Sequence, residues 1–171
     1  SSAATTGGEP SGQVWLVRPD GSKQVVDTGG LREPSGMTLS PDQTLLYVAD
    51  RDSRWVYSHV IQPDGTLAHK QRFYWLHTGD EQEDAAVGSL RVDTNGNLYA
   101  ATNIGIQICD QAGRVNAILP LPGGPVTALA FGGANFDTLY AVSGDKLYRR
   151  QLAAQAANAW AAPVKPPRPR L

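Results

Sequence analysis

LLYVAD, at residues 45–50, is a short apolar stretch whose pattern occurs three times in this 171-residue chain. It returns as NLYAAT at residues 97–102 and as TLYAVS at residues 138–143. Each copy follows a polar turn and precedes a second apolar run. The Leu-Tyr pairs stand 52 and 41 residues apart, which is the spacing of a repeated β-unit with loops of unequal length.

Every copy lies within the same order of expected strands. Alternation of apolar and polar residues with a period of two is typical of half-buried strands. The first unit is expected to form four strands, at residues 37–39, 45–49, 55–61 and 67–76. The second unit is expected at 90–92, 98–101, 104–109 and 115–119, and the third starts at 126 and ends with a strand at 147–152. An earlier hairpin, at 13–18 and 23–27, is expected to end at Gly29-Gly30.

Four antiparallel strands per unit, stacked by repetition, predict an all-β protein built from the blades of a β-propeller. The expected strands number two, four, four and three, so the incomplete units at the two ends do not combine into one closing blade. A six-bladed ring with roughly 40 to 45 residues per blade needs about 250 residues, and this chain supplies about half. A fragment, two assembling copies and edges capped in another way all explain this, and we favour the fragment.

We divide the chain into three parts. Residues 1–11 are a low-complexity N-terminal stub, 12–152 a partial propeller and 153–171 an Ala/Pro-rich tail. The stub lacks the basic and apolar regions of a signal peptide, so we expect a leader or the stub of a longer protein. The Pro-rich end of the tail is similar to the peptides that Pro-binding domains bind. A solvated or surface-laid tail is the favoured interpretation.

Composition narrows the class of protein. Apolar residues make up 41% and charged residues 18%, which is typical of a globular chain. The net charge of −1 predicts neither a nucleic-acid nor an anionic-membrane partner, and the longest apolar runs are strand-sized. A single cysteine excludes an internal disulfide. We expect a soluble protein, whose compartment (cytoplasmic, periplasmic or secreted) the sequence leaves open.

Three motifs carry a resemblance to a known family. They are EPSGMTLSPD at residues 33–42, LRVD at 90–93 and AFGGAN at 130–135. The Phe-Gly-Gly before a Leu-Tyr strand is the specific signal, since many propellers have the Ser-Pro-Asp turn. In this order, from residue 12 to about residue 152, the chain resembles the gluconolactonase / regucalcin (senescence marker protein) family.

The resemblance implies a six-bladed propeller of which this chain is the C-terminal half. Family members hydrolyse sugar lactones with one divalent cation, often Ca²⁺ or Zn²⁺, which polarises the lactone carbonyl and lowers the pKa of the attacking water. The ligands implied are Glu, Asn and Asp side chains from separate blades. The Asn position falls on Ser35 and the Asp position on Gly88, while the Glu belongs to the N-terminal half.

Other candidate site residues have both functional and structural interpretations. A slip of the loop before Gly88 offers Asp84 as a replacement for the lost Asp ligand. His77 precedes an acidic loop and is interpreted as an acid/base or metal ligand, or as part of a solvated loop. His59 and His69 alternate with apolar neighbours and are expected at the surface.

Two further motifs favour structural roles. DTNGN at residues 93–97 is faintly similar to a Ca²⁺ loop, but its Gly comes too early and no Glu closes it, which favours a hairpin turn. Cys109 lies in an apolar strand, which favours a buried structural thiol over a nucleophile.

Two functional hypotheses follow. The chain belongs either to a metal-dependent lactone hydrolase or to a degenerate propeller kept for binding or structure. The residues at Ser35 and Gly88 favour the second, and we expect the chain to be inactive by itself. The expected partners are a sugar lactone, if the protein is active, and either the missing N-terminal half or a second copy.

Overall fold

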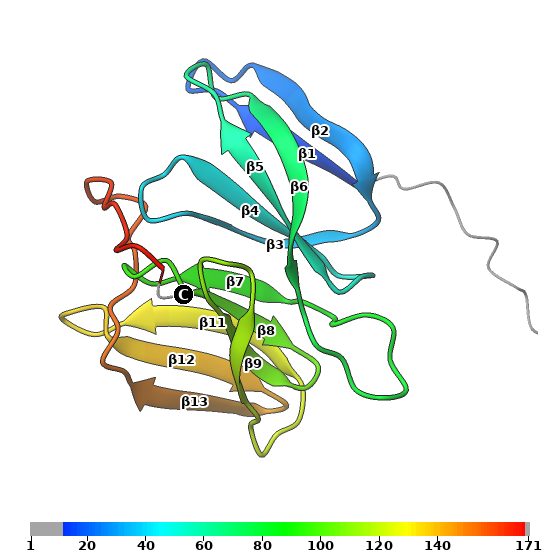
Figure 1. Ribbon diagram of the computed structural model, residues 1–171, viewed down its shortest axis with the longest axis vertical. Helices are drawn as coiled ribbons and strands as arrows, with labels where there is room; N and C mark the ends of the chain where they lie inside the picture. The colour runs from blue at the N-terminus through cyan, green and yellow to red at the C-terminus, as the bar shows by residue number, and fades with distance from the viewer. Residues whose placement is uncertain (1–11, 170–171) are drawn as a thin grey trace, which may run out of the picture.

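The computed structural model describes residues 12–169, which form thirteen β-strands in four antiparallel sheets and no helix (Figure 1). The strands are β1 (Gly12–Val17), β2 (Lys23–Leu31), β3 (Pro34–Leu39), β4 (Leu45–Asp50), β5 (Trp55–Ile61), β6 (Leu67–Trp75), β7 (Ser89–Val92), β8 (Leu98–Thr102), β9 (Gly105–Cys109), β10 (Val115–Leu119), β11 (Val126–Gly132), β12 (Thr138–Ser143) and β13 (Lys146–Gln151). Within this range no helix is long and apolar enough to cross a membrane.

Each strand pairs with the next along the chain. β1 and β2 form an N-terminal pair, β3–β6 the first blade, β7–β10 the middle blade and β11–β13 the last blade. The strand counts of two, four, four and three agree with the prediction. The all-β fold class and the blade architecture are thereby confirmed.

Strand β2 is longer than predicted. Gly29 and Gly30, expected to end the strand, lie inside it, and Leu31 pairs with Gly12. Gly30 has a φ of 75°, and the register shifts between Gly12 and Val14. The two glycines therefore lie in a bulge within the strand, where β2 has two more residues than β1 and a local kink absorbs them.

The repeated phrase forms the second strand of each unit and ends in a buried polar residue. Asp50, Thr102 and Ser143 are at most 2% exposed. The Asp50 carboxylate accepts hydrogen bonds from the amides of Arg32 and Glu33, at 3.2 and 2.9 Å. The Thr102 hydroxyl donates to the carbonyl of Gly105, where β9 begins, and the Ser143 hydroxyl to that of Gly124, in the loop before β11. These buried groups tie the loops to the blades, since a buried polar group needs a partner.

Neighbouring blades share their cores. Tyr47 packs in one cluster with Leu90, between the first and middle blades. Tyr99 packs in a second cluster with Leu129, between the middle and last blades. The first strands of the three blades lie side by side, and a Cβ added at Gly36 of β3 would lie only 3.2 Å from the Leu90 amide nitrogen. β3, β7 and β11 therefore form the inner wall of a partial ring.

The face of the last blade that points away from the middle blade is open; we term it the open side of the last blade. Val56, Ile106 and Leu147 occupy one register position, each opposite the fifth residue of the repeated phrase in its unit. Val56 and Ile106 are 0% and 3% exposed, whereas Leu147 is 68% exposed. A following blade covers the first two side chains, and no described residue covers the third.

Residues 153–169, which we term the C-terminal strap, cross the ends of all three blades. In Figure 1 the strap (orange to red) lies on one side of the sheets, and the long loop between β6 and β7 (green) lies on the other. The amides of Ala156, Ala157 and Val164 donate to the carbonyl oxygens of Phe136, Val92 and Pro41, respectively. The tail is thus laid on the surface of the blades.

Candidate functional site

Ser35 is the second residue of the inner strand β3, and Gly88 directly precedes the inner strand β7. The strap contacts the other end of β7, at Val92, and therefore lies at the opposite mouth of the channel. Ser35 is exposed and lines a hollow of about 290 Å³ together with Trp15 and Met37. Its short hydroxyl is one oxygen donor at this mouth.

Gly88 stands against the backbone of the last blade. Its amide donates to the carbonyl oxygen of Ala101 at 3.1 Å. A Cβ added at Gly88 would lie 2.1 Å from the carbonyl oxygen of Thr127 in β11. Because β11 approaches so closely, the position has neither a side chain nor room for one.

Asp84 is engaged in a local turn. Its carboxylate accepts a hydrogen bond from the Ala86 amide at 3.1 Å, and Ala86 has a φ of 46°. The Asp84 carbonyl accepts a further bond from the Asn103 side chain at 3.0 Å, and the Ala85 amide donates to Ser53 at 3.1 Å. These bonds hold the loop in place, so the proposed slip of Asp84 toward Gly88 would have to break them.

His77 is exposed, but its backbone is clamped by a residue that the sequence analysis missed. The fully buried Gln107 accepts from the His77 amide and donates to its carbonyl, each at 2.8 Å. Gln107 also donates to the Thr102 hydroxyl at 3.1 Å. The sequence signal for this clamp was the single side-chain amide in the apolar strand GIQIC, since a buried amide needs hydrogen-bond partners.

The surface prediction for His59 is wrong. His59 is 2% exposed, and its Nε2 lies 3.0 Å from the Asp27 carboxylate. Lys70 contacts the same oxygen at 2.6 Å and lies 4.6 Å from the ring centroid of Tyr57. The alternation in β5 was interpreted correctly as a strand, but β2 packs across its second face. His69 is exposed, as expected.

The same cluster perturbs the Asp27 carboxyl. Burial raises the pKa of Asp27, but hydrogen bonds from Lys70, the Gly29 amide and His59 outweigh it, so the pKa lies below its usual value. The Nδ1 atom of His59 is buried without a partner among the described residues. The cluster therefore connects β2 of the N-terminal pair to β5 and β6 of the first blade.

The geometry agrees with a hairpin turn at residues 93–97 and with a buried structural thiol at Cys109. The Asp93 carboxylate is buried and accepts from the amides of Asn95 and Asn97 and from the Tyr99 hydroxyl, as a hairpin turn requires. Cys109 is buried, and burial raises the pKa of its thiol to about 12. A thiol with that pKa is a poor nucleophile, because the thiolate is the reactive form.

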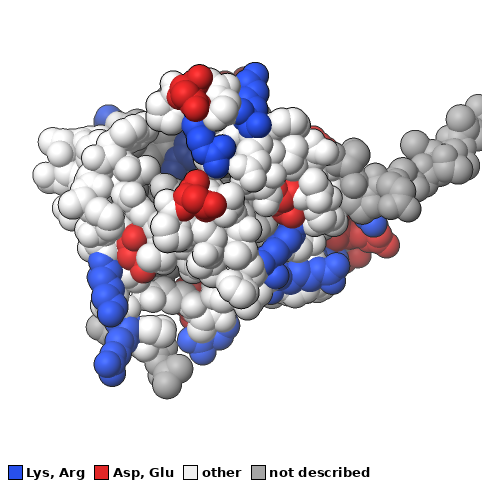
Figure 2. All heavy atoms as spheres, turned by 90° about the horizontal axis from the view of Figure 1, so that it is seen from above, with Lys and Arg blue, Asp and Glu red and all other residues white. Residues whose placement is uncertain are grey.

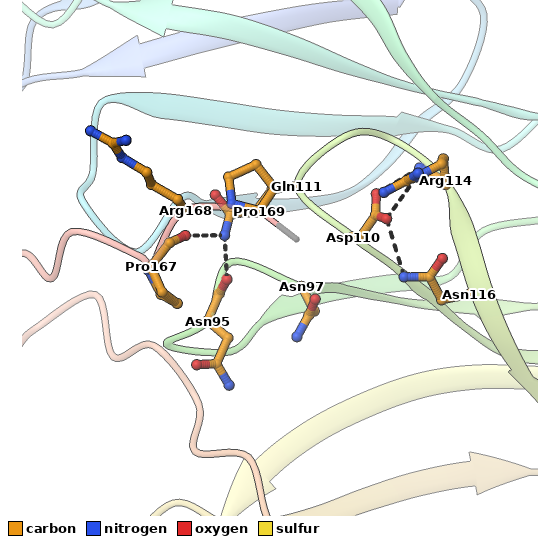
Figure 3. Close-up of a pocket in the computed structure, with 9 residues that line it drawn as sticks. All are labelled: Asn95, Asn97, Asp110, Gln111, Arg114, Asn116, Pro167, Arg168 and Pro169. Carbon is orange, nitrogen blue, oxygen red and sulfur yellow. Dashed lines mark hydrogen bonds and ion pairs between the residues drawn. The ribbon is translucent and has the colours of Figure 1, made fainter. Parts of the chain in front are cut away.

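A polar pocket of about 640 Å³ lies between the β7–β8 and β9–β10 turns of the middle blade, beside the strap (Figure 3). The Asp110 carboxylate accepts from Arg114 at 2.9 Å and from Asn116 at 3.2 Å. Gln111 donates to the carbonyls of Asn95 and Pro167, each at 2.7 Å. The polar groups of this pocket thus fasten the hairpin and the strap.

Charge does not indicate another site on the face drawn in Figure 2, where basic and acidic residues are interspersed. This agrees with the net charge of −1. No group of three or more His, Cys, Asp or Glu side chains within residues 12–169 is arranged to hold a metal ion.

The sequence matches the family described as SMP-30/Gluconolactonase/LRE-like region over residues 2–145, and the chain belongs to this family. It is 32% identical over 127 residues to a gluconolactonase of Zymomonas mobilis, covering 70% of this chain and 35% of that protein. A pentonolactonase of Haloferax volcanii is 26% identical over 132 residues, covering 75% and 44%. The solved gluconolactonase of Xanthomonas campestris superposes with a TM-score of 0.66 at 25% identity, covering 84% and 44%.

The family assignment confirms the resemblance seen in the three sequence motifs. The chain spans less than half the length of both curated relatives, at 35% and 44%. The activities named for those proteins therefore belong to larger molecules than the half-ring described above.

Proposed function

We propose that this chain is a scaffold half of a gluconolactonase-type propeller that neither holds a catalytic cation nor hydrolyses lactones by itself. The observation that supports this proposal is the packing at Gly88. If Gly88 had open space beside it, a single substitution could restore a ligand side chain. Instead, the Thr127 carbonyl oxygen occupies the space that the Cβ of such a side chain would need. The departure from the family pattern is thus part of the packing between two blades.

The cation implied by the family, Ca²⁺ or Zn²⁺, does not fit the residues present. Such a site needs several oxygen or nitrogen ligands that converge on one point. Ser35 supplies one hydroxyl, Gly88 supplies no side-chain atom, and the Asp84 carboxylate is hydrogen-bonded in its own turn. We therefore assign no catalytic step to a cation in this chain, nor to Asp84 or His77.

A lactone assay tests the proposal. Hydrolysis of glucono-δ-lactone by the 171-residue chain, measured in a pH-stat with Ca²⁺ or Zn²⁺, is expected to equal the spontaneous rate. Calorimetric titration with each cation is expected to show no stoichiometric binding. A cation-dependent rate above the background, together with binding of one cation per chain, would contradict the proposal.

The obvious rescue variant serves as a second test. Gly88→Asp combined with Ser35→Asn restores the residue types of the family. We expect the Gly88→Asp change to destabilise the blade contact and to restore no activity, because the Cβ meets Thr127. Ser35→Asn alone is the control, and it is expected to fold normally because Ser35 is exposed.

The proposal also includes a partner for the open side of the last blade. Further blades of the same kind are proposed to cover Leu147, since blades cover its equivalents Val56 and Ile106. A second copy is the alternative partner, but β13 of one copy beside the β1–β2 pair of another would give a blade of five strands. Light scattering separates the two, since a discrete dimer of this chain would favour the second copy.

A second candidate function is hydrolysis of a sugar lactone by the completed ring. It is favoured by the relatives, which are named gluconolactonase and pentonolactonase. Adding a polypeptide that supplies the other blades would produce activity under this hypothesis. No activity would be recovered if the chain is a binding or structural module.

A further inference from the structure

A hollow of about 590 Å³ lies between the inner strands and the C-terminal strap. Met37 and Leu39 of β3, Arg91 of β7, and Ala130 and Phe131 of β11 line it, and strap residues 156–160 close one side. Its volume is within the range of small-molecule sites, roughly 300 to 1,000 Å³. The walls are mainly apolar, with one cation among them.

The cation, Arg91, is half-buried and has no carboxylate partner. Its Nη1 atom donates to the carbonyl oxygen of the preceding residue, Leu90, at 2.6 Å. Arg91 forms no ion pair with any residue in the range 12–169, and no Asp or Glu lines the hollow. Burial lowers the pKa of its guanidinium, which reflects the loss of water around the charge.

Other arginines of the chain are accommodated differently. Arg114 pairs with Asp110 at 2.9 Å. Arg54 donates to two loop carbonyls and lies 4.8 Å from the ring centroid of Trp75, and Arg72 lies 5.7 Å from that of Trp55. Arg91 by contrast lines an apolar hollow, and its charge there has a backbone carbonyl but no carboxylate beside it.

We propose that Arg91 binds the carboxylate of a small organic acid in this hollow. A guanidinium has a planar set of donors that matches the two oxygens of a carboxylate, and the surrounding Met, Leu, Ala and Phe side chains accept the carbon skeleton. Arg91 follows Gly88 by three residues, which is about 10 Å along a strand. The site therefore lies farther along the channel, toward the strap, than the position at which the resemblance implies a cation. Binding of an acid there would be a function separate from lactone hydrolysis.

Two sources supply such a carboxylate. One is a sugar acid, which is what opening of a sugar lactone yields, and the other is an aliphatic acid, which suits the apolar walls better. Calorimetric titration of the 171-residue chain with sodium gluconate and with sodium hexanoate distinguishes them. Saturable binding of either acid, at one molecule per chain, supports the proposal, and the acid that binds more tightly identifies the source.

Variants localise the binding. Arg91→Gln is expected to weaken the binding at least about tenfold, since it removes a charge-assisted bidentate contact. Arg91→Lys is expected to be intermediate, because a point charge replaces the planar fork. Arg72→Gln is the matched control, and it is expected to bind like the unmodified chain because Arg72 lies on the outer strand β6.

Neutral hexanamide provides a test that needs no substitution. It keeps the carbon skeleton and removes the charge, so the unmodified chain is expected to bind it at least about tenfold more weakly than hexanoate. The proposal is overturned if neither acid binds saturably, if Arg91→Gln binds as tightly as the unmodified chain, or if hexanamide binds as well as hexanoate. Circular dichroism shows whether Arg91→Gln is folded, and the hexanamide comparison stands if it is not.

Discussion

The middle blade and the two ends of the half-ring have the same pattern of residues in different surroundings. Leu90 and Leu129 are 0% and 2% exposed, but Met37 at the equivalent position of the first blade is 66% exposed. At the other end Leu147 is exposed where Ile106 is buried. One apolar pattern therefore gives a core in the middle and an open surface at the ends, because burial depends on a neighbouring blade.

The largest expected effect comes from truncating the equivalent inner-strand residues. Leu90→Ala is expected to lower the free energy of unfolding by about 2–5 kcal/mol, since it leaves a cavity between two blades. Met37→Ala is expected to lower it by less than about 0.5 kcal/mol, because Met37 faces solvent. Urea unfolding followed by tryptophan fluorescence measures both. Equal losses would show that the two surroundings do not differ energetically.

The contact between the middle and last blades is tested at Gly88. Gly88→Ala is expected to cost about 1–3 kcal/mol of unfolding free energy, because the Cβ would lie 2.1 Å from the Thr127 carbonyl oxygen. Gly29→Ala is the control, since a Cβ there meets only the Asp27 carboxylate, at 3.7 Å. A normal urea midpoint for Gly88→Ala would mean that β11 moves away easily.

The N-terminal pair is tested through pH. Because the pKa of Asp27 is lowered in the folded state, its stabilisation is present above the unfolded pKa of about 3.9 and is lost as the pH falls through the folded value. Asp27→Asn is expected to cost about 1–3 kcal/mol at pH 7 and progressively less below pH 4. Urea midpoints between pH 2 and pH 7 measure this. A constant difference across that range would contradict the assignment.

The smallest effect is expected at the open side of the last blade. Leu147→Ser is expected to change the unfolding free energy by less than about 0.5 kcal/mol, because the side chain is already 68% exposed. Ile106→Ser, at the equivalent covered position, is the contrasting variant and is expected to cost several times more. A large loss for Leu147→Ser would show that another copy of the chain already covers this side.

The candidate site was less predictable than the fold. The sequence motifs assign two of the family's ligand positions to Ser35 and Gly88, and this assignment stays a prediction. That Gly88 has no room for a side chain depends on β11, which starts 38 residues later at Val126. His59 and Gln107 were missed as buried polar residues, since their partners Asp27 and His77 lie 32 and 30 residues away.

The sequence by itself determined the strands, their order and the family. A period of two, tight turns and a repeated Leu-Tyr phrase act over a few residues, so these features are legible without a partner. Only the tertiary structure decided which copy of the pattern is covered, how closely β7 approaches β11 and where the strap lies. It also placed Arg91 in a hollow without a carboxylate. These outcomes depend on which surfaces meet, and contacts between residues far apart in the chain decide that.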